Sequence, residues 1–154
     1  MAAKMFNHIK TLTSGPEKII DEVRELVKEG YSEIILIGIN LGAYGEDFEN
    51  KVTLDEIIDK VKEYQGKIKI NASLHTLSEK KFMDIIQTSK NYFSNTLDRL
   101  KAMSNAGIEV KANCVVLKGI NSDVEDFKEL FIKLPQYGVK TVKFLELLVI
   151  KSNE

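Results

Sequence analysis

The sequence has a single cysteine, Cys114, among its 154 residues. One thiol cannot form an internal disulfide, and it cannot supply the several thiolates of an iron–sulfur or zinc–thiolate site. The two histidines, His8 and His75, lie far from each other and from Cys114, without the close spacing of paired metal ligands. The sequence therefore predicts no metal site built from the residues of this chain alone.

Long apolar runs and arginine are also scarce. No apolar stretch approaches the roughly 20 residues of a membrane span, and Met1 to Lys10 contains no signal-peptide core, so we expect a cytoplasmic protein. Only Arg24 and Arg99, among 22 basic residues balanced by 23 acidic ones, could make bidentate contacts with phosphates or bases. We therefore predict neither a nucleic-acid nor a membrane partner.

The residues that are present favour a globular α/β protein. Hydrophobic residues make up 44% of the chain and charged residues 29%, and no low-complexity tract divides it, so we expect one domain over residues 1–154. A complete eight-unit barrel, at about 250 residues, is too long to fit. Helical and strand-like patterns alternate, with strands expected at Ile34–Ile37, Lys67–Leu74, Val110–Leu117 and Val142–Leu148.

The second expected strand carries the most informative pattern. Its side chains alternate, with Lys69, Asn71 and Ser73 on one face and apolar residues on the other. A doubly wound sheet would bury apolar residues on both faces, whereas a barrel interior can be polar. The pattern therefore favours a partial, incomplete TIM-type barrel of about four parallel strands with helices on the outer face.

Helix ends are marked by familiar capping residues. Thr53 with Glu56, and Ser122 with Glu125, have the spacing of capping boxes, and Ser78 is expected to begin a further helix. Gly107 is expected to end a helix in the left-handed conformation.

Polar residues gather where the strands end, which is where parallel α/β proteins place their sites. Each of these residues also has a purely structural interpretation. Asn40 and Asn121 lie beside glycines and could serve simply to shape turns, and His75 could be a helix cap or a surface residue. Cys114 is expected to pack as a small hydrophobe. Glu146 lies inside an apolar run, where a buried carboxylate would need a partner. The full set is Gly38, Ile39, Asn40, Ser73, His75, Lys118, Gly119, Asn121 and Glu146.

Several strings resemble a known superfamily. Residues 16–27, Gly38-Ile39-Asn40 and Tyr44-Gly45 resemble the segment after the cluster loop in radical S-adenosylmethionine methylthiotransferases. The later half is similar to the molybdenum-cofactor cyclases of the same superfamily, above all in Asn113 to Asn121 and in Phe144-Leu145-Glu146-Leu147.

The resemblance implies a partial α/β barrel in which three cysteines hold a 4Fe–4S cluster beside S-adenosylmethionine. It implies that Gly38 and Asn40 contact the methionine moiety. Asn71 or Ser73, together with Asn113, would hold the ribose and the carboxylate, and Leu117 would pack on the adenine. S-Adenosylmethionine is thus a cofactor candidate. The cluster is expected of the family but is not supported by this chain, and no catalytic residue is assigned.

The chain departs from the superfamily because the Cys-x3-Cys-x2-Cys loop is missing from this sequence. The resemblance also implies that one strand–helix unit before Asn113 is deleted. Whether Lys67–Leu74 stands for the third or the fourth strand of the family stays open. Our leading hypothesis is a non-catalytic remnant or excised fragment that keeps weak S-adenosylmethionine or partner binding. The alternatives are a fragment of an active enzyme whose cysteine loop lies outside this chain, and a purely structural domain.

Strand edges lead to a further expectation. A four-strand segment leaves two long edges, and the first and last expected strands carry few charges to block pairing. We therefore predict a homodimer, or docking onto another protein, at one of these edges, unless Met1 to Thr13 covers one of them.

Overall fold

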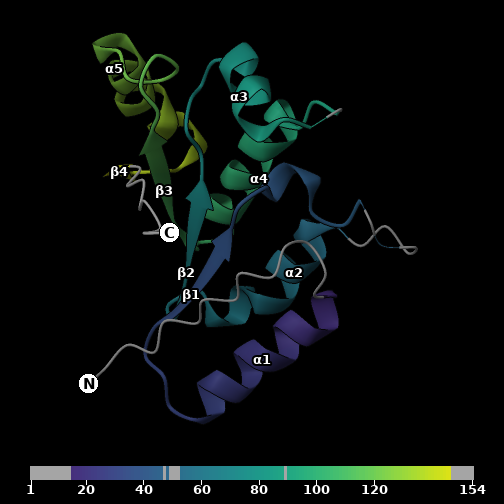
Figure 1. Cartoon of the computed structure of the whole chain (residues 1–154). Helices are drawn as coiled ribbons and strands as arrows, with labels where there is room; N and C mark the ends of the chain where they lie inside the picture. The colour runs from purple at the N-terminus through teal and green to yellow at the C-terminus, as the bar shows by residue number, and fades with distance from the viewer. Residues whose placement is uncertain (1–14, 47, 49–52, 89, 147–154) are drawn as a thin grey trace, which may run out of the picture.

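The computed structural model describes residues 15–46, 48, 53–88 and 90–146, and they form an alternating α/β fold (Figure 1). The strands are β1 (Ile34–Gly38), β2 (Ile68–Ser73), β3 (Glu109–Val116) and β4 (Thr141–Glu146). The helices are α1 (Pro16–Lys28), α2 (Leu54–Val61), α3 (Glu79–Ile86), α4 (Phe93–Asn105) and α5 (Val124–Lys133). Short 3-10 turns follow β1, α2 and α5, at Leu41–Ala43, Lys62–Tyr64 and Leu134–Tyr137.

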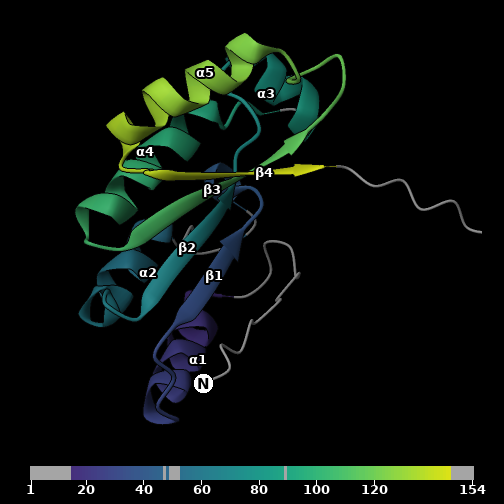
Figure 2. The same cartoon turned by 90° about the vertical axis from the view of Figure 1, so that its left-hand side faces the viewer.

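The four strands form one sheet in the order β1-β2-β3-β4, and every neighbouring pair is parallel. Figure 2 shows α1, α2 and α4 behind this sheet, with the other face turned toward the viewer. Successive parallel strands with helices on a single side are the arrangement of a barrel segment, and the sheet is not closed. The predicted fold class, a partial barrel of about four parallel strands, is confirmed.

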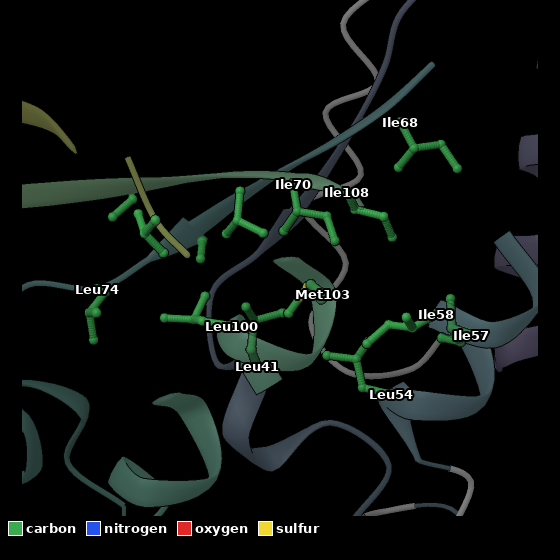
Figure 3. Close-up of a cluster of buried hydrophobic side chains, with 14 of the residues drawn as sticks. Leu41, Leu54, Ile57, Ile58, Ile68, Ile70, Leu74, Leu100, Met103 and Ile108 are labelled. Carbon is green, nitrogen blue, oxygen red and sulfur yellow. The ribbon is translucent and has the colours of Figure 1, made fainter. Parts of the chain in front are cut away.

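The core lies between the sheet and the helices. Alternate residues of neighbouring strands point into it, so that Ile34 pairs with Ile68 and Ala72 pairs with Ala112, both alanines being fully buried. Figure 3 shows Leu100 and Met103 of α4 beneath Ile70 and Ile108. The small alanines at the centre of the sheet let the helices approach closely.

Two of the predicted helix starts are wrong in detail. Thr53 is the N-cap of α2, but its side chain makes no capping hydrogen bond. The capping box of α5 is shifted by one residue, to Asp123 and Asp126, because the Ser122 hydroxyl accepts a hydrogen bond from the Gly119 amide instead (3.1 Å). The Ser78 cap of α3 is confirmed: its hydroxyl accepts from the Lys81 amide at 3.5 Å.

The edges of the sheet are as predicted, since β1 and β4 each pair with one strand among the described residues. The last expected strand was Val142–Leu148. The observed strand begins one residue earlier, and Leu147 and Leu148 lie outside the described residues, as does Met1 to Thr13. No helix in the described part of the chain is long and apolar enough to cross a membrane.

Candidate functional site

The face of the sheet without helices carries a group of polar side chains. Residues 69, 71 and 73 of β2 point to this face, opposite the buried Ile68, Ile70 and Ala72. Ser73 is the direct register partner of Asn113 on β3, and Asn71 lies one pair earlier on the same face. Lys69, Asn71, Ser73 and Asn113 share a face turned away from the helices, as the alternation predicts, but the expectation that all four lie near the carboxyl ends of the strands is wrong for Lys69, the second residue of β2. Two amides and a hydroxyl therefore lie together near the carboxyl ends of two adjacent strands.

Asn40 follows β1 at the same end of the sheet. Its Oδ1 atom is buried and has no hydrogen-bond partner. Among the described residues, no other buried side-chain oxygen or nitrogen lacks a partner. The side chain does not cap the 3-10 turn that begins at Leu41. A buried acceptor without a donor costs free energy on the order of 1–3 kcal/mol, so this oxygen is suited to a donor supplied from outside the chain.

Gly38, predicted beside Asn40, has a packing role. A Cβ atom built there would lie 2.1 Å from the side chain of Leu41, which is itself buried. Gly38 pairs with Ala72, so it lies on the helix-facing side of the sheet. Glycine at this position thus leaves room for the buried side chain of Leu41, next to Asn40.

The carboxyl ends of β2 and β3 are held together by Asn121, which is 1% exposed. Its Nδ2 donates to the carbonyls of His75 (2.7 Å) and Val115 (2.9 Å), and its Oδ1 accepts from the Leu117 amide (2.7 Å). These bonds use the amide fully, so Asn121 shapes this loop, as the simpler interpretation held. Asn121 also fixes the half-buried Leu117, the residue that the resemblance assigns to adenine packing.

His75 is neither a helix cap nor a surface residue. It is half-buried, and its Nδ1 accepts a hydrogen bond from the Val115 amide at 3.1 Å. This bond requires Nδ1 to be unprotonated, so the neutral ring carries its proton on Nε2. Burial lowers the pKa of His75 below its ordinary value of 6.5. His75 thus extends the contacts between β2 and β3 beyond the last pair of the ladder.

Charged residues near the amino ends of the strands form a network that our reading of the sequence missed. Lys69 pairs with Glu33 and with Glu109 (3.4 Å), and Glu109 also pairs with Lys111 at 3.2 Å. The pKa of Lys69 is raised mainly by its hydrogen bond to Glu33 and next by its hydrogen bond to Glu109. The bond from Lys111 is the main cause that lowers the pKa of Glu109. Period-2 alternation extended to the third strand would have placed Glu109 and Lys111 on this face.

Lys143 is a second residue missed as a site candidate, because in the sequence it counted only as one of the few charges of the last strand. It is the register partner of Asn113, so one row across the open face runs from Ser73 through Asn113 to Lys143. Its side chain is exposed. The row therefore combines a hydroxyl, an amide and a cation.

The remaining candidates at the strand ends are exposed. Glu146 is exposed, so the expectation of a buried carboxylate that needs a partner is wrong; it lies at the end of β4, opposite Val116. Lys118, Gly119 and Ile39 are also exposed. Gly119 has a φ of +78°, which glycine adopts without strain.

Cys114 packs as a small hydrophobe, as predicted. It is fully buried on the helix-facing side of β3, and burial raises the pKa of its thiol to about 11. Within the described residues, no three histidine, cysteine or acidic side chains are grouped so that they could hold a metal ion. One buried thiol on the wrong face does not fit an iron–sulfur cluster.

Comparison with known proteins relates part of the chain to tRNA-modifying enzymes. The chain is 47% identical over 51 residues to tRNA-2-methylthio-N(6)-dimethylallyladenosine synthase of Clostridium botulinum (strain Okra / Type B1). The same enzyme of Desulforamulus reducens is 43% identical, and that of Clostridioides difficile 45%, over matches of the same length. Each match covers 33% of this chain and 11% of the relative, so the chain spans about a tenth of the curated relatives. No family model matches the chain.

A solved structure shares the fold. The crystal structure of Streptococcus suis SuiB bound to S-adenosylmethionine covers 92% of this chain with a TM-score of 0.50 and 13% identity, and the chain covers 35% of SuiB. A radical SAM methyltransferase from Sphaerobacter thermophilus covers 85% with a TM-score of 0.44 and 16% identity, and 47% of it is covered. The resemblance to the radical S-adenosylmethionine superfamily is thus confirmed through methylthiotransferase relatives. These relatives do not bear on the cyclase-like second half, which stays a prediction.

Proposed function

From the relation to radical S-adenosylmethionine methylthiotransferases, we propose that this chain is a piece of such a core that binds S-adenosylmethionine on the open face of its sheet. The observation that carries the proposal is the buried Oδ1 of Asn40, which has no hydrogen-bond donor at the carboxyl end of β1. Ligands of parallel α/β proteins bind at this end of the sheet. The proposed activity of the isolated chain is binding without radical chemistry.

The polar side chains match the functional groups of S-adenosylmethionine. Asn40 Oδ1 can accept a hydrogen bond from the ammonium group of the methionine moiety. Asn71, Ser73 and Asn113 offer amide and hydroxyl donors to its carboxylate and both donors and acceptors to its ribose hydroxyls. Leu117 offers an apolar side chain to the adenine, and Gly38 leaves room for the Leu41 side chain beside Asn40.

The residues of this chain do not fit the iron–sulfur cluster, which is the second group that the superfamily uses. A 4Fe–4S cluster needs three thiolates from the protein, whereas this chain has one cysteine, buried away from the open face. Bound beside a reduced cluster, S-adenosylmethionine supplies radical chemistry. The residues of this chain can only hold and orient the molecule.

Isothermal titration calorimetry with S-adenosylmethionine tests the proposal. We expect saturable binding to the full chain, weakened about tenfold by Asn40→Ala and by Asn113→Ala, because each loses a hydrogen bond to a charged or polar group of the ligand. Asn105→Ala, which removes an exposed asparagine from the end of α4, is the matched control and should bind like the parent chain. Absent binding, or equal weakening by all three variants, would contradict the proposal.

A second candidate function is that of a fragment of an active methylthiotransferase whose cysteine loop lies outside this chain. The sequence matches cover only 11% of the length of the relatives, which favours this candidate. It is tested by reading the coding sequence upstream of Met1. A cysteine triplet in frame would support the fragment, and a stop codon in frame just before Met1 would support the remnant.

A further inference from the structure

The turn that follows Asn40 is tied to helix α4 by Arg99. The guanidinium of Arg99 donates through Nη1 to the carbonyl of Leu41 and through Nη2 to the carbonyl of Tyr44, the latter at 3.3 Å. These carbonyls belong to the first residue of the 3-10 turn and to the residue just after it. A guanidinium can bridge two acceptors because its N–H donors form a fixed planar fork. Arg99 therefore holds both ends of the turn that Asn40 precedes.

The arginine at this position differs from an ordinary surface cation. The chain has only two arginines among its 22 basic residues. Arg24, on α1, is 46% exposed and pairs with Asp21 at 3.3 Å, one helical turn away. Arg99 is half-buried and uses its fork on two backbone carbonyls instead. A lysine carries one ammonium group and does not reproduce this planar geometry.

Gly42 brings the same turn into direct contact with the start of α4. A Cβ atom built at Gly42 would lie 2.5 Å from the carbonyl oxygen of Tyr92 and 2.5 Å from Oγ1 of Thr96. Thr96 is 2% exposed, and its hydroxyl donates to the same Tyr92 carbonyl at 2.8 Å. Thr96 and Arg99 are three positions apart, so they lie on one face of α4. The helix thus holds the turn at two points.

These contacts restrict the backbone on both sides of Asn40. The Asn40 carbonyl accepts a hydrogen bond from the Ala43 amide at 3.2 Å, and Gly38 packs against the side chain of Leu41. The Oδ1 atom of Asn40 is nevertheless buried without a donor. An unfavourable local arrangement of this kind persists only where the surrounding structure fixes it.

We propose that Arg99 is a positioning residue, which holds Oδ1 of Asn40 ready to accept a hydrogen bond from the ammonium group of the bound methionine moiety. This role rests on the proposed binding of S-adenosylmethionine and deepens it. Arg99 acts through Asn40, because its own donors are used by the carbonyls of Leu41 and Tyr44. An acceptor that is already ordered binds a donor more tightly, because less conformational freedom is lost on binding.

Isothermal titration calorimetry with S-adenosylmethionine tests this role through pairs of substitutions. Arg99→Lys keeps the charge but loses the fork, and we expect it to weaken binding about fivefold. In a chain that already carries Asn40→Ala, the same substitution should cause no further weakening. Gly42→Ala displaces the turn by steric contact and should depend on Asn40 in the same way. Arg24→Lys is the matched control and should bind like the parent chain.

Hydrogen exchange of the chain without ligand measures the turn itself. The amides of Ala43 and Tyr44 close the 3-10 turn by donating to the carbonyls of Asn40 and Leu41, at 3.2 and 3.3 Å. We expect both amides to exchange faster in Arg99→Lys than in the parent chain or in Arg24→Lys. Unchanged exchange in β2 and β3 would show that the variant is folded.

The outcomes distinguish this role from the proposed function. Absent binding by the parent chain would contradict the proposed function and, with it, the role of Arg99. Binding that depends on Asn40 but not on Arg99 would overturn the positioning role alone. Equal weakening by Arg99→Lys with and without Asn40→Ala, or unchanged exchange of the Ala43 and Tyr44 amides, would also overturn it.

Discussion

At the scale of single residues, His75 connects protonation to the packing of the strand ends. Its Nδ1 accepts from the Val115 amide, and its carbonyl accepts from Asn121, so both its ring and its backbone hold β2 to β3. Burial lowers the pKa of the folded-state imidazole, which means that the folded chain prefers the neutral ring. Protonating Nδ1 would remove the hydrogen bond to Val115.

The pKa of His75 predicts how stability changes with pH. Above the unfolded-state pKa of about 6.5 both states are neutral, and as the pH falls below it the unfolded chain takes up the proton first. The free energy of unfolding should therefore fall between about pH 7.5 and 5.5, and more steeply than in His75→Gln. Urea denaturation of both proteins measures this difference, and equal slopes would contradict the role of His75.

At the scale of elements, a partly buried ion pair joins α3 to α5. The Lys81 ammonium lies 2.6 Å from Oδ1 of Asp126, whose side chain is 8% exposed. Oδ2 of the same carboxylate accepts from the Asp123 amide at 3.4 Å and completes the capping box of α5. One carboxylate thus fixes both the start of α5 and its position beside α3.

Replacing this carboxylate should be costly. We expect Asp126→Asn to lower the free energy of unfolding by about 1–3 kcal/mol, because the partly buried Lys81 loses its counter-charge and the cap is weakened. Glu125→Gln breaks the exposed pair with Lys128 and should change the stability by less than about 0.5 kcal/mol. Chemical denaturation measures both variants, and similar effects for the two would contradict the assignment.

At the scale of the whole molecule, the open sheet offers a polar face without cluster ligands. We expect anaerobic reconstitution with iron and sulfide to give no stoichiometric iron–sulfur cluster, because Cys114 is fully buried on the helix-facing side and its pKa is about 11. Iron and sulfide assays and the visible spectrum measure the outcome. Cys114→Ala serves as the control and should behave like the parent chain, whereas one cluster per chain or per dimer would contradict the expectation.

The sequence determined the local and periodic features of this protein. The alternation from Ile68 to Ser73 predicted which side chains leave the core, because successive residues of a strand point to opposite faces. Four strands separated by helices were predicted from apolar periodicity, and the number of cysteines excluded a cluster held by this chain alone. The resemblance of Gly38-Ile39-Asn40 to methylthiotransferases depended on short contiguous strings, which sequence alone displays.

Only the tertiary structure decided the features that join distant residues. That Ser73, Asn113 and Lys143 form one row depends on the register of three strands, which local periodicity does not set. The unpartnered Oδ1 of Asn40, the clamp of Asn121 and the exposure of Glu146 depend on what packs around each side chain. Burial and hydrogen bonding are properties of the assembled chain, because the groups that cover or satisfy a residue come from elsewhere in the sequence.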